Sequence, residues 1–192
     1  MQQLILASTS PYRRALLQRL GLPFAMVSPK VDETAAAGEM PEASAQRLAE
    51  AKARAVASRY PDSLIIGSDQ VATLGPLRLN KPLVHENAVR QLQAARGKAV
   101  SFHTAVCLLD TASGDAQHRL VSCVVHFRDY SDAQIERYLR REQPYDCAGS
   151  AKIEGLGIAL VARLEGDDPS ALIGLPLIAL TAMLEARGVS VI

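Results

Sequence analysis

Short apolar runs alternate along the chain with longer segments whose charged and apolar residues recur at helical spacing. Apolar runs of this length favour strands, and the longer amphipathic segments favour helices. The predicted strands cover residues 4–7, 24–27, 64–67, 100–109, 120–127 and 157–164. The predicted helices cover residues 11–20, 41–59, 86–96 and 176–187, with one more beginning after Ser131. Polar and irregular segments, such as residues 28–40 and 75–82, are expected to be loops.

Several helix boundaries carry recognisable signals. Ser10 is a suitable N-cap, and Pro11 suits the first helical position because proline lacks an N–H group. Ser131 and Gln134 have the spacing of a capping box. Glycines follow three of the predicted helices, where a left-handed residue commonly ends a helix. These glycines are Gly21, Gly97 and Gly188.

Strands interspersed with helices indicate an α/β domain. The strands at 100–109 and 120–127 follow each other directly, joined by the turn Ser113-Gly114-Asp115, so the sheet is expected to be mixed rather than purely parallel. The sequence contains neither an internal repeat nor a linker. We therefore predict a single domain over residues 1–192.

Composition narrows the classes of partner. The 21 basic and 20 acidic side chains among 192 residues give a net charge of +1, which argues against binding a nucleic acid polymer. The apolar stretch at 172–184 is too short to span a membrane and contains Gly174 and Pro176. The three cysteines lack C-x-x-C spacing, which favours free thiols in a reducing cytoplasm. The four histidines show no close metal-ligand spacing.

The first candidate site is the strand-to-helix junction at residues 8–14. A helix N-terminus presents unpaired N–H groups and a positive potential, so it attracts phosphate. Ser8 and Ser10 add hydroxyl groups, and Arg13 and Arg14 add charges suited to phosphate. A capped helix with two solvated arginines explains the same residues, so this segment alone leaves both interpretations open.

Asp69 is the second candidate, because it follows the apolar run at 64–67 directly. Ligands of open α/β sheets lie at the carboxyl ends of strands, although a turn or capping aspartate would also fit. Lysine is scarce, with five lysines against sixteen arginines, which singles out Lys52 and Lys81 as phosphate-binding cations. Glu33 and Asp69 supply carboxylates for a divalent ion. Neither a P-loop nor a G-x-G-x-x-G motif is present.

Five motifs together resemble the Maf family of nucleotide pyrophosphatases. They are Leu-Ile-Leu-Ala-Ser-Thr-Ser-Pro-Tyr-Arg-Arg at 4–14, Val-Asp-Glu-Thr at 31–34, Gly-Ser-Asp-Gln-Val at 67–71, Asn-Lys-Pro at 80–82 and Ala-Gly-Ser at 148–150. The resemblance implies a cytoplasmic enzyme, dependent on a divalent cation (Mg²⁺ or Mn²⁺), that cleaves a nucleoside triphosphate into a monophosphate and pyrophosphate. It also implies a two-lobed α/β domain with a central cleft, similar to inosine-triphosphate pyrophosphatases.

The resemblance assigns roles to particular positions. The residues that match the family's active site are Ser8, Arg13, Glu33, Lys52, Asp69 and Lys81. Asp69 matches the proposed proton acceptor, and Asp69 with Glu33 would hold the metal. The charged side chains expected to converge are Arg13, Arg14, Lys52, Lys81 and Lys152 on one side and Glu33, Asp69 and Glu154 on the other. The sequence leaves a homodimer open.

Three positions depart from the commoner family pattern. Tyr12, Gln70 and Glu154 stand where arginine, threonine and glutamine accompany dTTP and UTP hydrolysis. The departures resemble the branch that acts on 7-methyl-GTP. An aromatic ring attracts the positive charge of N7-methylguanine, and a carboxylate can accept hydrogen bonds from the N1–H and the N2 amine of that base.

Two other functions stay open at this point. The same family chemistry could act on dTTP, UTP or a damaged nucleotide, which assays of substrate preference would reveal. A non-catalytic nucleotide-binding regulator of septum formation, another role linked to the family, is also compatible with the resemblance. The full charged set argues against such a regulator, because binding alone does not need Asp69.

Overall fold

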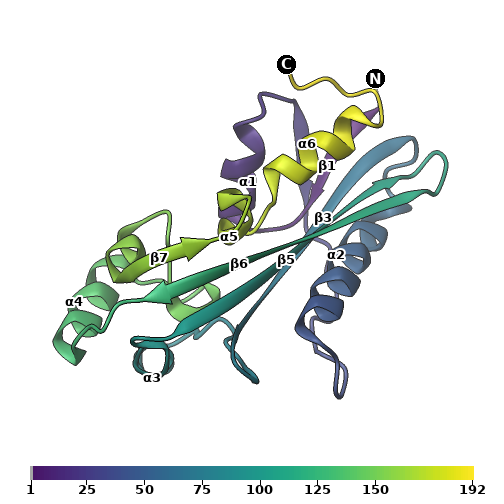
Figure 1. Cartoon of the computed structure of the whole chain (residues 1–192). Coiled ribbons are helices and arrows are strands. Elements are labelled where there is room, and N and C mark those ends of the chain that lie inside the picture. Colours follow the sequence, from purple (N-terminus) through teal and green to yellow (C-terminus); the bar gives the residue numbers. More distant parts are fainter. Residues whose placement is uncertain (1) are drawn as a thin grey trace. The chain divides into compact units, whose positions relative to one another are not determined.

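A computed structural model describes residues 2–192 of the chain (Figure 1). Its elements in chain order are β1 (Gln3–Ala7), α1 (Pro11–Gln18), β2 (Phe24–Val27), α2 (Pro41–Ala57), β3 (Ser63–Leu74), β4 (Leu77–Arg78), α3 (His85–Ala95), β5 (Ala99–Asp110), β6 (Ala116–Phe127), α4 (Asp132–Glu142), η1 (Ala148–Ser150), η2 (Leu156–Leu160), β7 (Val161–Glu165), α5 (Pro169–Ile173) and α6 (Leu177–Glu185). The two η elements are short 3₁₀ helices.

The strands form one seven-stranded sheet with the order β2-β1-β3-β5-β6-β7, and β4 pairs with β3. β1 is parallel to both β2 and β3, whereas the β3–β4 and β6–β7 pairs are antiparallel. This mixed sheet confirms the predicted α/β class.

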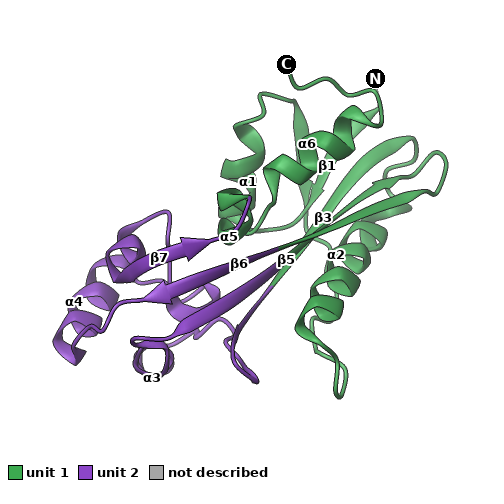
Figure 2. Cartoon of the chain, in the orientation of Figure 1, with its two compact units in different colours: residues 1–70, 104–121, 168–192 green, residues 71–103, 122–167 purple. Residues whose placement is uncertain are grey.

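The chain divides into two compact units, coloured green and purple in Figure 2. The first unit comprises residues 1–70, 104–121 and 168–192, and the second comprises residues 71–103 and 122–167. Strands β3, β5 and β6 each contribute residues to both units.

The core of the first unit follows from the alternation of side chains along its strands. Leu4 of β1 pairs with Leu64 of β3 in parallel register, so their side chains share one face of the sheet. This face packs against apolar residues of α1 and α6, among them Leu17 and Leu180, which are fully buried. Burial of these side chains fixes the position of α1, whose N-terminus follows the end of β1.

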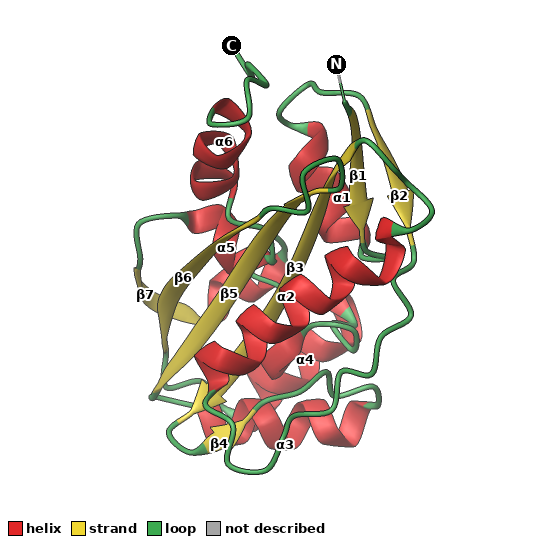
Figure 3. Ribbon diagram, turned by 90° about the vertical axis from the view of Figure 1, so that its right-hand side faces the viewer, coloured by secondary structure: helices red, strands yellow, loops and turns green. Residues whose placement is uncertain are grey.

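Helix α2 covers the opposite face of β1 and β3 (Figure 3). A Cβ atom at Gly67 of β3 would lie 2.0 Å from Ala49 O and 2.8 Å from Ala53 N. Only glycine therefore allows the helix backbone to approach the strand this closely. Ala49 and Ala53 are fully buried at this contact.

The second unit is built around α3, α4 and the antiparallel β6–β7 pair. Helices α3 and α4 pack against each other, and Leu92 of α3 and Ile135 and Leu139 of α4 are fully buried. Tyr130, just before α4, donates a hydrogen bond from its hydroxyl to Leu92 O at 2.9 Å. These contacts give the unit its own apolar core.

The predicted capping signals are confirmed, although α1, α2 and α6 end at Gln18, Ala57 and Glu185, each before its predicted end. Ser10 Oγ accepts a hydrogen bond from Arg13 N at 3.3 Å, and Pro11 begins α1. Ser131 and Gln134 form both hydrogen bonds of the capping box. The glycines after the helices, Gly21, Gly97 and Gly188, all have positive φ angles.

Other expectations differ from the structure. Residues 157–160 of the predicted strand 157–164 belong to the 3₁₀ helix η2, and strand β7 begins only at Val161. The N–H groups of Gly155 and Gly157 both donate to Lys152 O, which coils the backbone at this point. The predicted loop 75–82 contains β4, which forms a hairpin with β3, and the short helix α5 was not predicted.

Candidate functional site

A buried ion pair between Lys52 of α2 and Asp69 of β3 lies at the centre of the candidate site in the first unit. Lys52 Nζ is 2.6 Å from Asp69 Oδ1 and 2.7 Å from Glu33 Oε1. The side chains of Lys52 and Asp69 are 5% and 9% exposed, whereas that of Glu33 is 56% exposed. One ammonium group therefore joins a buried carboxylate to one that reaches solvent.

The strand and helix periods explain why Lys52 and Asp69 meet. Asp69 lies two residues after Gly67, so both residues point to the face of β3 that α2 covers. Lys52 is adjacent to Ala53, which packs on that same strand. The close approach at Gly67 thus brings the lysine within hydrogen-bond distance of the aspartate.

The position of Asp69 corrects one detail of the sequence prediction. The strand does not end before Asp69, since β3 continues to Leu74. However, β1 ends at Ala7, which pairs with Gly67, and so Asp69 lies just beyond the carboxyl end of the neighbouring parallel strand. The expected location at the strand ends therefore applies to β1 rather than to β3.

The surroundings of Asp69 favour its protonated form more than water does. Burial raises the pKa of Asp69, and the nearby Glu33 charge acts in the same direction. The charges of Lys52 and Arg13 oppose this effect but do not cancel it. A carboxylate with a raised pKa is a better proton acceptor near neutral pH than an exposed aspartate.

The N-terminus of α1 adds fixed polar groups and a cation. Ser8 is buried and its Oγ accepts a hydrogen bond from Ser10 N at 3.1 Å. Arg13 Nε donates to Gly174 O at 2.8 Å, which holds the guanidinium in place. Burial lowers the pKa of Arg13, while the charges of Asp69 and Glu33 raise it. Arg13 is therefore not a solvated surface arginine.

Two other residues of this helix start differ from Arg13. Arg14 is exposed, which agrees with the interpretation of this residue as a solvated arginine of a capped helix. Tyr12 is partly buried in the first turn of α1, next to Arg13 in sequence. The helix start therefore combines a held arginine with a partly accessible aromatic ring.

The loop that carries Glu33 is tied to α2 by Arg47, a contact that sequence reasoning did not anticipate. Arg47 binds Glu39 through two hydrogen bonds of 2.6 and 2.9 Å and also donates to Thr34 O at 3.2 Å. Glu39 in turn accepts a hydrogen bond from Ala36 N at 3.0 Å. The bonds with Arg47 are the main reason that the pKa of Glu39 is lowered to about 2.

Gln70 points to the face of β3 opposite Asp69. Its Nε2 lies 3.0 Å from each of three oxygens, Thr104 Oγ1, Ala171 O and Leu172 O. Gln70 thus fastens α5 to the sheet. Its amide nitrogen is engaged by the protein itself, which sequence reasoning did not foresee.

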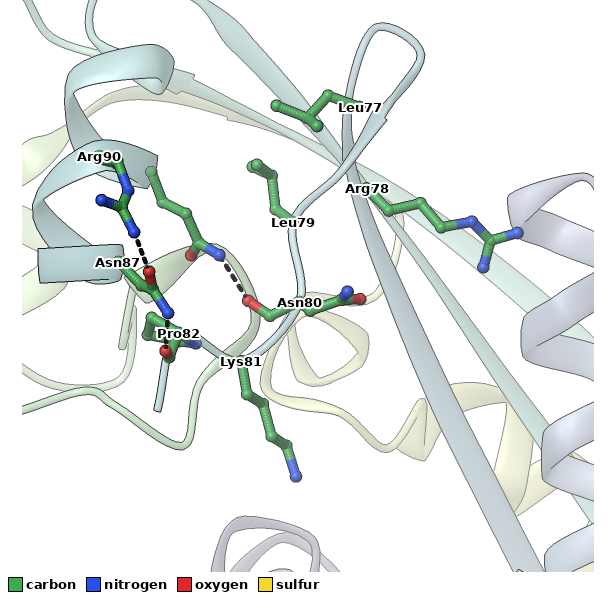
Figure 4. Close-up of a pocket in the computed structure, with 9 residues that line it drawn as sticks. Leu77, Arg78, Leu79, Asn80, Lys81, Pro82, Asn87 and Arg90 are labelled. Atoms are coloured by element: carbon green, nitrogen blue, oxygen red, sulfur yellow. Dashed lines mark hydrogen bonds between the residues drawn. The ribbon is translucent and has the colours of Figure 1, made fainter. Parts of the chain in front are cut away.

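Lys81 belongs to the second unit and lies beside a pocket of about 360 Å³ (Figure 4). Helix α3 binds the carbonyl groups of the two residues that flank this lysine. Gln91 Nε2 donates to Asn80 O, and Asn87 Nδ2 donates to Pro82 O, each at 2.8 Å. Figure 4 shows the lysine side chain extending away from these contacts. The backbone of Lys81 is therefore fixed while its ammonium group extends outward.

Glu154 also belongs to the second unit, in the segment between η1 and η2. Partial burial raises the pKa of Glu154, and the charge of Lys152 opposes the rise. Lys152 itself forms an ion pair with Glu142 at 2.8 Å. Sequence reasoning did not single out Glu142. Because Lys81, Lys152 and Glu154 lie in the second unit, their convergence with Asp69 stays a prediction.

Metal binding rests on the two carboxylates that share Lys52. Within residues 2–192, no cluster of three or more His, Cys, Asp or Glu side chains is arranged to hold a metal ion. Glu33 and Asp69 nevertheless present oxygen atoms to one point where a positive charge already sits. One or two carboxylates completed by substrate phosphates is a common arrangement for Mg²⁺.

Comparison with known proteins identifies the family. A family model described as Maf-like protein matches residues 3–187, and the chain belongs to the Maf family. This confirms the resemblance seen in the five motifs.

Across the described part of the chain, no helix is both long and apolar enough to cross a membrane.

Relatives with a more specific name cover the whole chain. A 7-methyl-GTP pyrophosphatase of Methylobacillus flagellatus is 60% identical over 192 residues, covering 100% of both chains. A protein of the same name from Nitrosospira multiformis is 59% identical over 191 residues, covering 100% of this chain and 96% of the relative. A solved HAM1 protein from Coxiella burnetii superposes with a TM-score of 0.46 at 16% identity, over 68% of this chain and 75% of that one.

Proposed function

We propose that this protein is a nucleoside triphosphate pyrophosphatase that converts 7-methyl-GTP to 7-methyl-GMP and pyrophosphate. The observation that carries the proposal is the buried Lys52–Asp69 pair, which is joined to Glu33 and lies just beyond the end of β1, the strand that leads into α1. The proposal is supported by relatives of that name at 59–60% identity over essentially the full chain.

In the proposed reaction, a water molecule attacks the α-phosphorus in line with the leaving group. A bond forms between the water oxygen and the α-phosphorus while the bond from this phosphorus to the bridging oxygen breaks. Pyrophosphate departs with the electron pair. Asp69 orients the water and accepts its proton, a role favoured by the raised pKa of this buried carboxylate.

We also propose that Glu33 and Asp69 hold a divalent cation, Mg²⁺ or Mn²⁺. Such an ion, when bound with substrate, neutralises the charge that develops on the phosphate oxygens. The exposure of Glu33 leaves its carboxylate accessible to an ion that arrives with a nucleotide. Removal of the metal with EDTA is expected to abolish activity, and added Mg²⁺ or Mn²⁺ is expected to restore it.

The cations and the helix start would bind the triphosphate. Arg13 and Lys52 lie close enough to Asp69 to affect its pKa, and Ser8 lies just before α1, whose N-terminus favours anions. Lys81 would bind the leaving phosphates, a role supported by the two α3 amides that fix its backbone. Together these groups would stabilise negative charge on the departing pyrophosphate.

Specificity would come from Tyr12, Gln70 and Glu154. The Tyr12 ring would stack on the cationic base, and the Glu154 carboxylate would accept hydrogen bonds from the guanine edge. Gln70 would act through α5, since its amide nitrogen contacts Thr104, Ala171 and Leu172.

We propose that the two units work as one domain, because the family model spans residues of both. A cytoplasmic location is also proposed, and the lack of a disulfide among the described cysteines agrees with a reducing compartment. The oligomeric state, for which a homodimer is a candidate, can be measured by light scattering on the same preparation.

The test is a pyrophosphate-release assay on 7-methyl-GTP, GTP, UTP and dTTP with Mg²⁺ or Mn²⁺. We expect the largest kcat/KM on 7-methyl-GTP. A preference for UTP or dTTP would assign the protein to the pyrimidine branch of the same chemistry. Binding without release of pyrophosphate from any nucleotide would favour a non-catalytic regulator.

A further inference from the structure

The segment of the second unit that carries Glu154 is held by two side chains of helix α4. The first is Tyr138, which is buried. Its hydroxyl accepts a hydrogen bond from Lys152 N at 3.0 Å and donates one to Ser150 O at 3.2 Å. These bonds fix the backbone immediately before Glu154.

The second side chain is Glu142, the last residue of α4. Its carboxylate accepts a hydrogen bond from Leu156 N at 2.6 Å and lies 2.8 Å from Lys152 Nζ. A Cβ atom at Gly155 would lie 2.7 Å from Glu142 Oε2, so glycine gives the carboxylate room to reach the backbone. This contact fixes the segment immediately after Glu154.

Tyr138 and Glu142 are four residues apart, and so they lie on the same face of α4, one turn from each other. An acidic residue at a helix C-terminus faces the negative end of the helix dipole, which is unfavourable for the helix itself. Any stabilisation by Glu142 therefore comes from its ion pair with Lys152 and its hydrogen bond with Leu156. One helix face thus holds the chain on both sides of Glu154.

We infer that Glu142 is a positioning residue for base recognition, which holds the segment 152–156 so that Glu154 presents its carboxylate to the guanine edge. This inference rests on the proposed function, because it assigns Glu142 to the recognition of 7-methyl-GTP. Glu142 need not touch the nucleotide, since its carboxylate is engaged by Lys152 and Leu156. Its removal should loosen the segment and weaken discrimination between bases.

The first experiment measures, without nucleotide, how strongly Glu142 restrains the segment that carries Glu154. Hydrogen exchange of a peptide covering residues 150–157 is compared in the wild type, Glu142→Ala and the control Glu136→Ala. Glu136 is another acid of α4, but it pairs with His85 and Arg140 instead of this segment. We expect faster exchange in Glu142→Ala only. Equal exchange in all three proteins would overturn the inference.

The second experiment measures the ratio of kcat/KM for 7-methyl-GTP to that for GTP. In Glu142→Ala we expect this ratio to fall by about tenfold, mainly through a higher KM for 7-methyl-GTP. Glu142→Gln keeps an acceptor for Leu156 N, so its ratio should fall less than that of Glu142→Ala. Tyr138→Phe should lower the ratio as well. Faster exchange with an unchanged ratio would overturn the positioning role.

The wild-type protein separates this inference from the proposed function. If the wild type itself shows no preference for 7-methyl-GTP, the proposed substrate is wrong, and no variant is needed to establish it. If the wild type prefers 7-methyl-GTP while Glu142→Ala keeps the full ratio, only the role of Glu142 fails.

Discussion

Lys52 Nζ donates a hydrogen bond to Asp69 Oδ1 at 2.6 Å, and both side chains are almost completely buried between α2 and β3. Neither charge has ready access to water as a substitute partner. The pair is therefore sensitive to any change that removes one member alone.

Asp69→Asn is expected to lower kcat by about 10²–10⁴-fold, because the amide cannot accept the proton of the attacking water. The fold should persist, since asparagine keeps the shape of the side chain and an oxygen acceptor for Lys52. Pyrophosphate release and circular dichroism measure the two effects. Asp167→Asn, at an exposed position, is the control and should keep normal turnover. Near-normal activity of Asp69→Asn would contradict the assignment.

Lys52→Met should destabilise the protein by about 3–5 kcal/mol, because it leaves the buried Asp69 carboxyl group without its main partner. The double variant Lys52→Met/Asp69→Asn should recover part of this loss, since no unpaired charge then remains. Urea denaturation at neutral pH gives the four free energies of unfolding. Strictly additive losses would show that the two residues are not coupled.

Gly67→Ala should destabilise the protein by about 3 kcal/mol, because the new Cβ would have to displace the backbone of α2 at Ala49 and Ala53. The same displacement would separate Lys52 from Asp69 and lower activity. Gly38→Ala is the matched control: Gly38 has positive φ but open space around it, so only backbone strain of about 1–2 kcal/mol is expected. Equal losses in the two variants would contradict the close packing.

The combined replacement of Tyr12→Arg, Gln70→Thr and Glu154→Gln is expected to shift preference towards UTP or dTTP. The cationic N7-methylguanine base would lose the Tyr12 ring and the Glu154 carboxylate as partners, so kcat/KM for 7-methyl-GTP should fall by about tenfold or more. Gln70→Thr alone should also lower stability by about 1–2 kcal/mol, because it removes the donor to two α5 carbonyls. An unchanged ratio of kcat/KM values in the triple variant would remove the specificity assignment.

Arg47→Met should lower stability at neutral pH and have less effect in acid. The pKa of Glu39 in the folded protein is lowered from its ordinary 4.5 to about 2, mainly by Arg47, so the ionised pair stabilises the fold above the ordinary value. This contribution is lost as pH falls from about 4.5 towards 2. Thermal melts across this range should show the wild type and the variant converging. Arg54→Met, which breaks an exposed pair on the same helix, should show little change with pH.

Sequence reasoning singled out Lys52, Asp69 and Glu33, which the structure brings together, although their role as a site stays a prediction. The apolar run before Asp69 and the cap at Ser10 are local signals: the cap forms as predicted, and the run is a strand, although this strand continues past Asp69 to Leu74. The scarcity of lysine also singled out Lys52, which the structure places on Asp69. Local patterns could not supply the length of β3 relative to β1, since the strand-end position of Asp69 depends on β1 ending at Ala7 opposite Gly67.

The missed features depend on contacts between distant segments. In the sequence, Glu142 resembles an ordinary acidic residue of a helix surface. Its role depends on the segment 150–157, which packs on α4 in the folded chain. Arg47 likewise becomes meaningful only when the loop before α2 returns to it. The glycine-driven coil at residues 155–157 overrode the strand preference of the aliphatic residues that follow.

The alternation of β3 has an evolutionary consequence. Asp69 points to α2, while its neighbours Ser68 and Gln70 bind carbonyls at α5 and Gly174 on the other face. Position 70 can therefore mutate without altering the partners of the aspartate. A duplicated gene could acquire a new nucleotide preference through that face of the strand, while its inherited hydrolytic chemistry stays intact on the other.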